Sequence, residues 1–247
     1  MTIARSDPGT RVTTFPFMER PMVGILLAAI AGMLNAWSLA ETGTFATVQS
    51  GNLVTAGYSL AMGDWSHIAR ALASILCFGL GAGVNAIVVT LLIRSGRTYS
   101  GPVLFVQAGI ILVLGALATA GVAPAMVVAL GVSFVAGSQG NAFHRDHGML
   151  YGNIAVTFVV QSFFSLLGRV LVPSSAAGRR VDAQSALIYG GVLIAFAAGA
   201  ALGFLIDTLF TAGSLWAAAG ITLIVGLIAV TRRDPQSVDP AQNAPTP

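Results

Sequence analysis

The chain has 247 residues, of which 55% are hydrophobic and only 9% are charged. A soluble domain carries roughly 25% charged residues to solvate its surface, so this composition excludes a mainly water-exposed surface and predicts a membrane protein. The net charge of +3 comes from arginines scattered between apolar runs. This pattern excludes nucleic acid as a partner, because nucleic-acid binding needs a concentrated basic face.

The two ends of the chain differ in composition from its middle. Residues 1–20 are polar and include Pro8 and Pro16, and residues 232–247 are rich in Pro, Gln and Asp. Both ends are predicted to be disordered tails. Residues 21–231 contain long apolar runs and no polar block of domain size, so a single membrane domain is expected there.

This middle part contains eight apolar segments. In chain order they are 21–40, 45–62, 68–93, 102–120, 123–141, 151–171, 186–207 and 211–231. A helix needs ~20 mainly apolar residues to cross ~30 Å of hydrocarbon, and six segments meet this requirement. Segments 45–62 and 151–171 are interrupted by polar residues and are predicted to be re-entrant or broken helices. The expected fold is therefore an all-α integral membrane protein with about six transmembrane helices.

The arginines favour six crossings over eight. If all eight segments crossed, nine arginines would lie on the side of the N-terminus and three on the other side. If the two polar segments enter and leave on one side, the numbers become eleven and one, with Arg70 alone outside. Cytoplasmic loops retain positive charge. Both tails and the 142–185 region are therefore expected on the cytoplasmic side.

Short motifs recur in the same order along the chain. The matching pairs are Asn35-Ala36 with Asn141-Ala142, Gly51-Asn52 with Gly152-Asn153, and Asp64 and Phe78 with Asp182 and Phe196. They predict two repeats, residues 21–120 and 123–231. With three crossings in each repeat, the second is inverted relative to the first, a 3+3 plan common among transporters.

The same residues resemble the signature of a known family. Gly32-Met33-Leu34-Asn35-Ala36, Phe45 and Ser50-Gly51-Asn52 resemble the Gly-x-x-Asp-Ala…Phe…Thr-Gly-Asn pattern of the YoaK-like bacterial membrane proteins. Gln139-Gly140-Asn141-Ala142 and Tyr151-Gly152-Asn153 resemble the second half of that pattern. The resemblance implies about six helices and a place in the bacterial cytoplasmic (inner) membrane, with no assigned activity. Asn35 stands where the family often has Asp, which weakens any proton-carrying role for a carboxylate there.

Polar side chains in hydrocarbon are expensive and normally face the protein interior or a watery cavity. Both polar segments carry such side chains along one helical face. We expect these residues, with the asparagines of the repeated motifs, to line a solute path: Asn35, Gln49, Asn52, Thr55, Asn141, Asn153, Thr157 and Gln161. The alternative is that they form hydrogen bonds between helices and hold the bundle together.

His144-Arg145-Asp146-His147 is the only cluster with metal-ligand character. A zinc site needs three or four ligands and second-shell partners, and Glu41, Asp64 and His67 are predicted on the opposite side of the membrane. We expect no metal and no cofactor. The favoured function is a transporter or channel-like protein for a small neutral or weakly charged solute, with solute and membrane lipid as partners. The alternatives are a membrane-embedded enzyme acting on a lipid or isoprenoid through this loop, and a non-catalytic scaffold. Homo-oligomer formation is left open.

Overall fold

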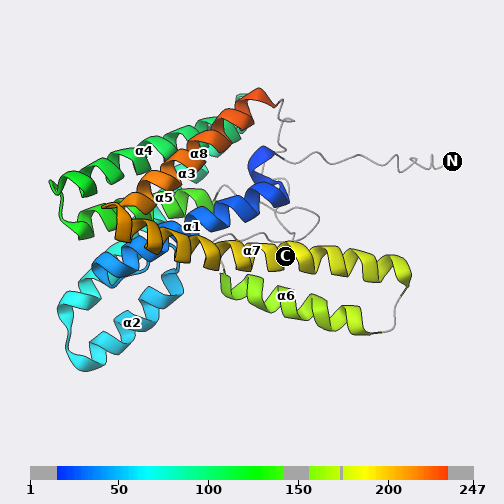
Figure 1. The fold of residues 1–247 in the computed structure, drawn as a ribbon, viewed down its shortest axis with the longest axis horizontal. Coiled ribbons are helices and arrows are strands. Elements are labelled where there is room, and N and C mark those ends of the chain that lie inside the picture. Colours follow the sequence, from blue (N-terminus) through cyan, green and yellow to red (C-terminus); the bar gives the residue numbers. More distant parts are fainter. Residues whose placement is uncertain (1–15, 142–155, 173–174, 233–247) are drawn as a thin grey trace, which may run out of the picture.

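A computed structural model describes residues 16–141, 156–172 and 175–232 (Figure 1). Every regular element in these ranges is a helix, as the sequence predicts. The elements are the 3-10 helix η1 (Phe17–Glu19) and the α-helices α1 (Pro21–Thr42), α2 (Gln49–Met62), α3 (Trp65–Arg94), α4 (Ser100–Ala120), α5 (Ala125–Asn141), α6 (Val156–Leu171), α7 (Ala176–Leu209) and α8 (Gly213–Thr231).

Five of the described helices are long and apolar enough to cross a membrane, namely α1, α3, α4, α7 and α8. Helix α5, predicted to be a sixth crossing, has 17 residues. At 1.5 Å per residue it spans about 25 Å, the lower end of the range for a transmembrane helix. Helices α2 and α6 have 14 and 16 residues. They are the two segments for which a full crossing was not predicted.

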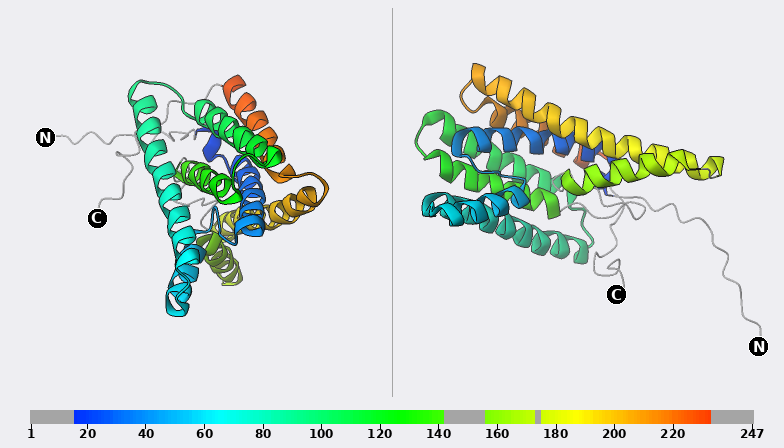
Figure 2. Two further views of the ribbon diagram at one scale, coloured as in Figure 1. Left: turned by 90° about the vertical axis from the view of Figure 1, so that its left-hand side faces the viewer. Right: turned by 90° about the horizontal axis from the view of Figure 1, so that it is seen from below.

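The largest difference from the predicted segments lies at the start of α7. The apolar criterion placed this start at residue 186, whereas the helix begins at Ala176. Ser175 caps it, because its side chain accepts a hydrogen bond from the Gly178 N–H at 3.1 Å. A capped helix continues through charged residues such as Arg179, which a hydropathy criterion excludes. Figure 2 shows that the α6–α7 hairpin consequently extends past the rest of the molecule.

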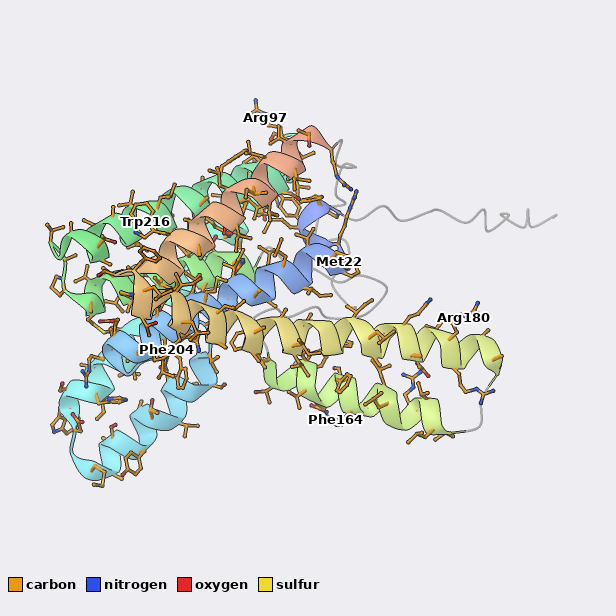
Figure 3. All side chains as sticks on the ribbon, in the orientation of Figure 1. Met22, Arg97, Phe164, Arg180, Phe204 and Trp216 are labelled. Carbon is orange, nitrogen blue, oxygen red and sulfur yellow. The ribbon has the colours of Figure 1, made fainter. Side chains whose placement is uncertain are left out.

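Large apolar side chains cover the outside of the described helices. Met22, Phe164, Phe204 and Trp216 belong to four different helices and point outward in Figure 3, with exposed fractions between 42% and 75%. A soluble monomer rarely shows contiguous apolar surface on this scale. The solvent that suits this surface is lipid, so the chain is a multi-pass membrane protein.

The body of the molecule is held together by three extensive helix pairs, α1 with α7, α3 with α5, and α4 with α8 (Figures 1 and 2). Helices α1 and α7 run in the same direction, since Gly191 faces Ile25 and Gly203 faces Met33. The two short helices form hairpins with their successors, α2 with α3 and α6 with α7. The main pairs therefore join helices that are distant in the sequence.

Glycines bring α1 and α7 into backbone contact. A Cβ at Gly32 would overlap the carbonyl oxygen of Phe196, and a Cβ at Gly199 would overlap that of Ala29. Small residues allow such an approach, which increases van der Waals contact between helices in lipid. Gly199 and Gly203, four residues apart on α7, therefore both pack closely against α1.

Helices α3 and α5 cross in the same way. A Cβ at Gly81 would overlap the carbonyl oxygen of Phe134, and a Cβ at Gly137 would overlap that of Phe78. Gly79 and Gly83 on α3 have the same four-residue spacing as Gly199 and Gly203 on α7, but they have open space around them. They lie on either side of Gly81 and, at about 100° per residue, face away from the crossing.

The two crossings have matching spacings. Phe78 precedes Gly81 by three residues on α3, as Phe196 precedes Gly199 on α7. On the partner helices, Ala29 precedes Gly32 by three residues, as Phe134 precedes Gly137. Each residue of one crossing therefore has a counterpart in the other. By this register the counterpart of Asn35 is Gly140, one residue before Asn141 in the sequence.

Three segments meet at one end of the molecule. The guanidinium groups of Arg20 and Arg232 lie 5.6 Å and 5.8 Å from the ring centre of Phe17. Next to them the Tyr99 hydroxyl donates to Oε1 of Glu19. The start of α1, the α3–α4 turn and the end of α8 therefore share one end of the bundle.

Candidate functional site

The residues between α1 and α2 form a buried connection. Thr44, Ala46 and Thr47 are almost completely buried. The main-chain polar groups of such a segment need hydrogen-bond partners, because burial separates them from bulk water. Asn35 supplies one, since its Oδ1 accepts a hydrogen bond from the Thr47 N–H at 3.1 Å. Ser38 supplies another by donating to the Thr44 carbonyl at 2.8 Å.

Asn52 is the central residue of this region. Its Oδ1 accepts from the Phe45 N–H at 2.9 Å, and its Nδ2 donates to the Phe45 carbonyl at 2.6 Å. Nδ2 also lies 2.8 Å from Oε1 of Gln49. The side chain has no exposed surface. In this structure the amide predicted to bind solute is engaged by protein groups.

Two serines extend the hydrogen bonds of Asn52 across the bundle. Ser74 Oγ on α3 lies 3.1 Å from Nδ2 of Asn52 and 2.9 Å from Oγ of Ser133 on α5. Both serines are buried. Sequence reasoning missed them, because single serines in apolar helices are common and give little signal. The result is a neutral, hydrogen-bonded polar cluster that joins α2, α3 and α5, which we name the Asn52 cluster (Gln49, Asn52, Ser74 and Ser133).

The structure brings together only part of the predicted site. Asn35, Gln49 and Asn52 surround the 43–48 connection, and Thr55 on α2 donates to the Gly51 carbonyl of its own helix at 3.0 Å. Thr157 and Gln161 instead lie exposed on α6, which packs against α7. Figure 1 shows α2 and α6 as parts of separate hairpins.

The remaining predicted positions lie at or beyond the limits of the described chain. Asn141 is the last residue of α5, and nothing is described of its side chain. Asn153, His144 and His147 lie outside the described residues. Within the described ranges no three His, Cys, Asp or Glu side chains are grouped so that they could hold a metal ion.

A second set of buried amides lies between α3, α4 and α5. Asn85 is 4% exposed and Gln107 is 1% exposed, and both line a cavity of about 120 Å³ together with Ser138. Sequence reasoning missed these residues, because neither belongs to a stripe of several polar side chains. The available signal was weaker, one amide in the middle of an otherwise apolar span, which by itself points to the protein interior or a cavity.

Comparison with known proteins gives a family and no assigned activity. No curated protein and no solved structure matches the chain. A family model described as "Protein of unknown function (DUF1275)" matches residues 23–228, which include most of α1, all of α2 to α7 and most of α8. The chain therefore belongs to the DUF1275 family.

Proposed function

We propose that this protein is a transporter for a small neutral or weakly charged solute, built from two inverted halves in a bacterial cytoplasmic membrane. The first half comprises α1 to α4 and the second α5 to α8. The solute path runs along the crossing of α3 and α5, one of the three helix pairs that join the two halves. We also propose that the motifs that resemble the YoaK-like pattern relate this chain to the YoaK-like proteins.

The internal correspondence of the helices supports two inverted halves. Helices α4 and α8 run in opposite directions, because a Cβ at Gly115 would lie 3.5 Å from Cβ of Leu215 and one at Gly226 would lie 3.3 Å from Cβ of Leu104. Leu104 precedes Gly115 by the same interval as Leu215 precedes Gly226. With the matched glycine crossings, this gives every helix of the body a counterpart. Inverted halves of this kind place a transported solute at their interface.

The observation that carries the proposal is the difference between the two crossings. At the α3–α5 crossing, Ser74 and Ser133 are hydrogen-bonded neighbours. Their counterparts at the α1–α7 crossing are Val192 and Ala28, which pack in one apolar cluster. At these matched positions, polar groups therefore occupy only one of the two equivalent crossings. A purely structural need for interhelical hydrogen bonds would apply to both.

The polar groups extend far along α3. Ser74 and Asn85 lie eleven residues apart on this helix, which corresponds to about 16 Å of helix axis. This is about half of a hydrocarbon layer ~30 Å thick. The groups along this line are amides and hydroxyls, so they suit an uncharged hydrogen-bonding solute better than an ion.

The arrangement of arginines supports the proposed orientation. Arg20 and Arg232 lie at one end of the bundle, and the α3–α4 turn at that end carries Arg94 and Arg97. Figure 3 labels Arg97 there, and Arg180 marks the protruding end of the α6–α7 hairpin. Positive charge is retained on the cytoplasmic side of a membrane. The end of the bundle that holds Arg20 and Arg232 is therefore proposed to face the cytoplasm.

Cysteine accessibility tests the path. In a Cys77→Ser background, Ser74→Cys and its counterpart Val192→Cys are exposed to a membrane-impermeant cationic thiol reagent in right-side-out and in inside-out vesicles. Alternating access exposes the path to each side in turn, so Ser74→Cys should react from both faces while Val192→Cys should stay protected. Ser133→Cys and Ala28→Cys repeat the comparison on the partner helices.

The possible outcomes separate the functions. Protection of both serine variants from both faces overturns the proposed path and favours a scaffold. Reaction from one face only contradicts alternating access and indicates a blind pocket. Because two independent variant pairs are compared, failure of one variant to fold leaves the test intact.

A further inference from the structure

The cavity between α3, α4 and α5 is lined almost entirely by apolar side chains. It has a volume of about 120 Å³. Val84 and Val88 of α3 and Val106 of α4 are among its lining residues, and all three are more than 40% exposed. The cavity is therefore in contact with the lateral surface of the bundle between α3 and α4, which in a membrane faces lipid.

Two buried amides give this apolar cavity a polar end. Nδ2 of Asn85 and Oε1 of Gln107 have no hydrogen-bond partner among the described residues. The amide of Gln107 is anchored on one side, because its Nε2 donates to Ser138 Oγ at 3.1 Å. This bond leaves Oε1 as the free end of the amide. Each of the two cavity-lining amides thus keeps one atom without a partner, a donor in Asn85 and an acceptor in Gln107.

Such free groups are unusual in a protein interior. Buried polar atoms are nearly always hydrogen-bonded, and an unpaired one loses its hydration without compensation. Folding alone gives no reason to keep two of them at one cavity. A ligand that supplies the missing hydrogen-bond partners gives such a reason.

The equivalent region between α1, α7 and α8 has neither the amides nor this space. Counting from the matched glycines, the counterpart of Asn85 is Gly203 and that of Ser138 is Met33. A Cβ at Gly203 would lie 3.0 Å from Cα and 3.3 Å from Cγ of Met33, so the methionine side chain fills this place. The counterpart of Gln107 is Ala218, because Gln107 follows Leu104 by three residues and Ala218 follows Leu215 by three residues. The polar cavity is therefore a feature of the α3–α5 side alone.

We infer that this cavity binds a small neutral molecule that carries a hydrogen-bond acceptor and a donor next to each other on an apolar body, such as a primary carboxamide or an alcohol. Asn85 donates to the acceptor of the ligand, and Gln107 accepts from its donor. The apolar body lies among the valines. A comparable apolar cavity of 150 Å³ holds a benzene molecule, so a ligand with about six non-hydrogen atoms fits.

The inference names the solute class for the path proposed above and rests on that function, but binding is measured without transport. The probe is isobutyramide, and the control is 3-methyl-2-butanone, a ketone of the same shape that lacks the N–H donors. Both are titrated by saturation-transfer NMR against the detergent-solubilised full chain, with protein-free micelles as the blank. We expect isobutyramide to bind about tenfold more tightly than the ketone, because one hydrogen bond distinguishes them.

Three variants locate the site. Gln107→Met keeps the length of the side chain and removes the acceptor, so the preference for the amide should disappear. Ser138→Met introduces at the cavity the residue type of its counterpart, Met33. Both probes should then lose binding, because a methionine side chain fills this place at the other crossing. Gln139→Met is the matched control, because Gln139 is a buried amide of α5 with a free Oε1 that does not line the cavity.

The results decide between clear alternatives. Equal binding of amide and ketone, no binding of either, or an unchanged preference in Gln107→Met overturns the inference. Loss of preference in Gln139→Met as well would place the effect elsewhere in the protein. Binding of isobutyramide together with protected cysteines at residues 74 and 133 would retain the ligand site and refute the transport path.

Discussion

The side chain of Asn52 pairs with both main-chain groups of Phe45, accepting from its N–H at 2.9 Å and donating to its carbonyl at 2.6 Å. The two atoms of one amide thus replace the partners that a strand or helix would otherwise provide. Phe45 lies in the middle of the buried connection between α1 and α2. Asn52 therefore sets the path of the chain at this point.

Replacing Asn52 with Leu should destabilise the protein by about 2 kcal/mol, because it leaves the N–H of Phe45 without a partner, which costs ~1–3 kcal/mol when buried. It also removes one of two donors to the Phe45 carbonyl, which keeps its hydrogen bond from Ser74 Oγ. An ordinary hydrogen bond between membrane helices contributes only ~0.6 kcal/mol on average, so the two estimates differ measurably. Thermal unfolding in detergent gives the comparison. Thr55→Val is the control, because Thr55 donates only to carbonyls of its own helix. A melting temperature equal to that of Thr55→Val would refute the role assigned to Asn52.

The glycines of α3 should respond to alanine with opposite signs. Gly81→Ala places a methyl group on the carbonyl oxygen of Phe134 and must push α3 and α5 apart, for which we expect a loss of about 3 kcal/mol, the upper end of overpacking effects. Gly79→Ala meets open space and should gain up to ~1 kcal/mol from helix propensity. Both variants change the composition identically, and unfolding curves measured side by side separate them. Similar losses in both would mean that the helices do not cross at Gly81.

The proposed orientation predicts which end of α3 reacts with a reagent from outside the cell. Ser66 and Ser95 lie at opposite ends of this 30-residue helix and are both exposed. In a Cys77→Ser background, an impermeant thiol reagent added to intact cells should label Ser66→Cys and leave Ser95→Cys unlabelled. Permeabilised cells, in which both positions should react, provide the control. The reverse pattern would invert the orientation, and labelling of both in intact cells would refute a crossing by α3.

The positions of the helices could be predicted from the sequence because a lipid solvent requires long apolar runs whose main-chain groups bond internally. The start of α7 could not, since a capped helix continues through Arg179 and Arg180 where hydropathy ends. The sequence also showed that Asn52 belongs to a polar stripe facing the interior. It could not show that its partner is Phe45, because that depends on the burial of the connection between α1 and α2.

The partner of Asn85 could not be predicted from the sequence for a different physical reason. A single amide in an apolar helix has the same local sequence whether its partner is another helix, a ligand or a lipid headgroup. Only the packing of α4 and α5 around α3 creates the cavity and leaves Nδ2 unpaired. The same argument separates Asn85 from Asn52, which is equally buried and fully engaged.

This contrast gives the last prediction. Asn85→Leu should raise the melting temperature of the ligand-free protein, by an amount that corresponds to about 1 kcal/mol, since it removes an unpaired buried donor and fills part of an apolar cavity. Asn52→Leu, the same substitution at another buried position, should lower it. Sites that bind ligands are often stabilised by substitutions that abolish binding, because the free groups they keep are costly without the ligand. Thermal unfolding of the two variants in one detergent decides the matter. If Asn85→Leu is destabilised as much as Asn52→Leu, the amide of Asn85 has a structural partner, and the cavity loses the feature that marks it as a ligand site.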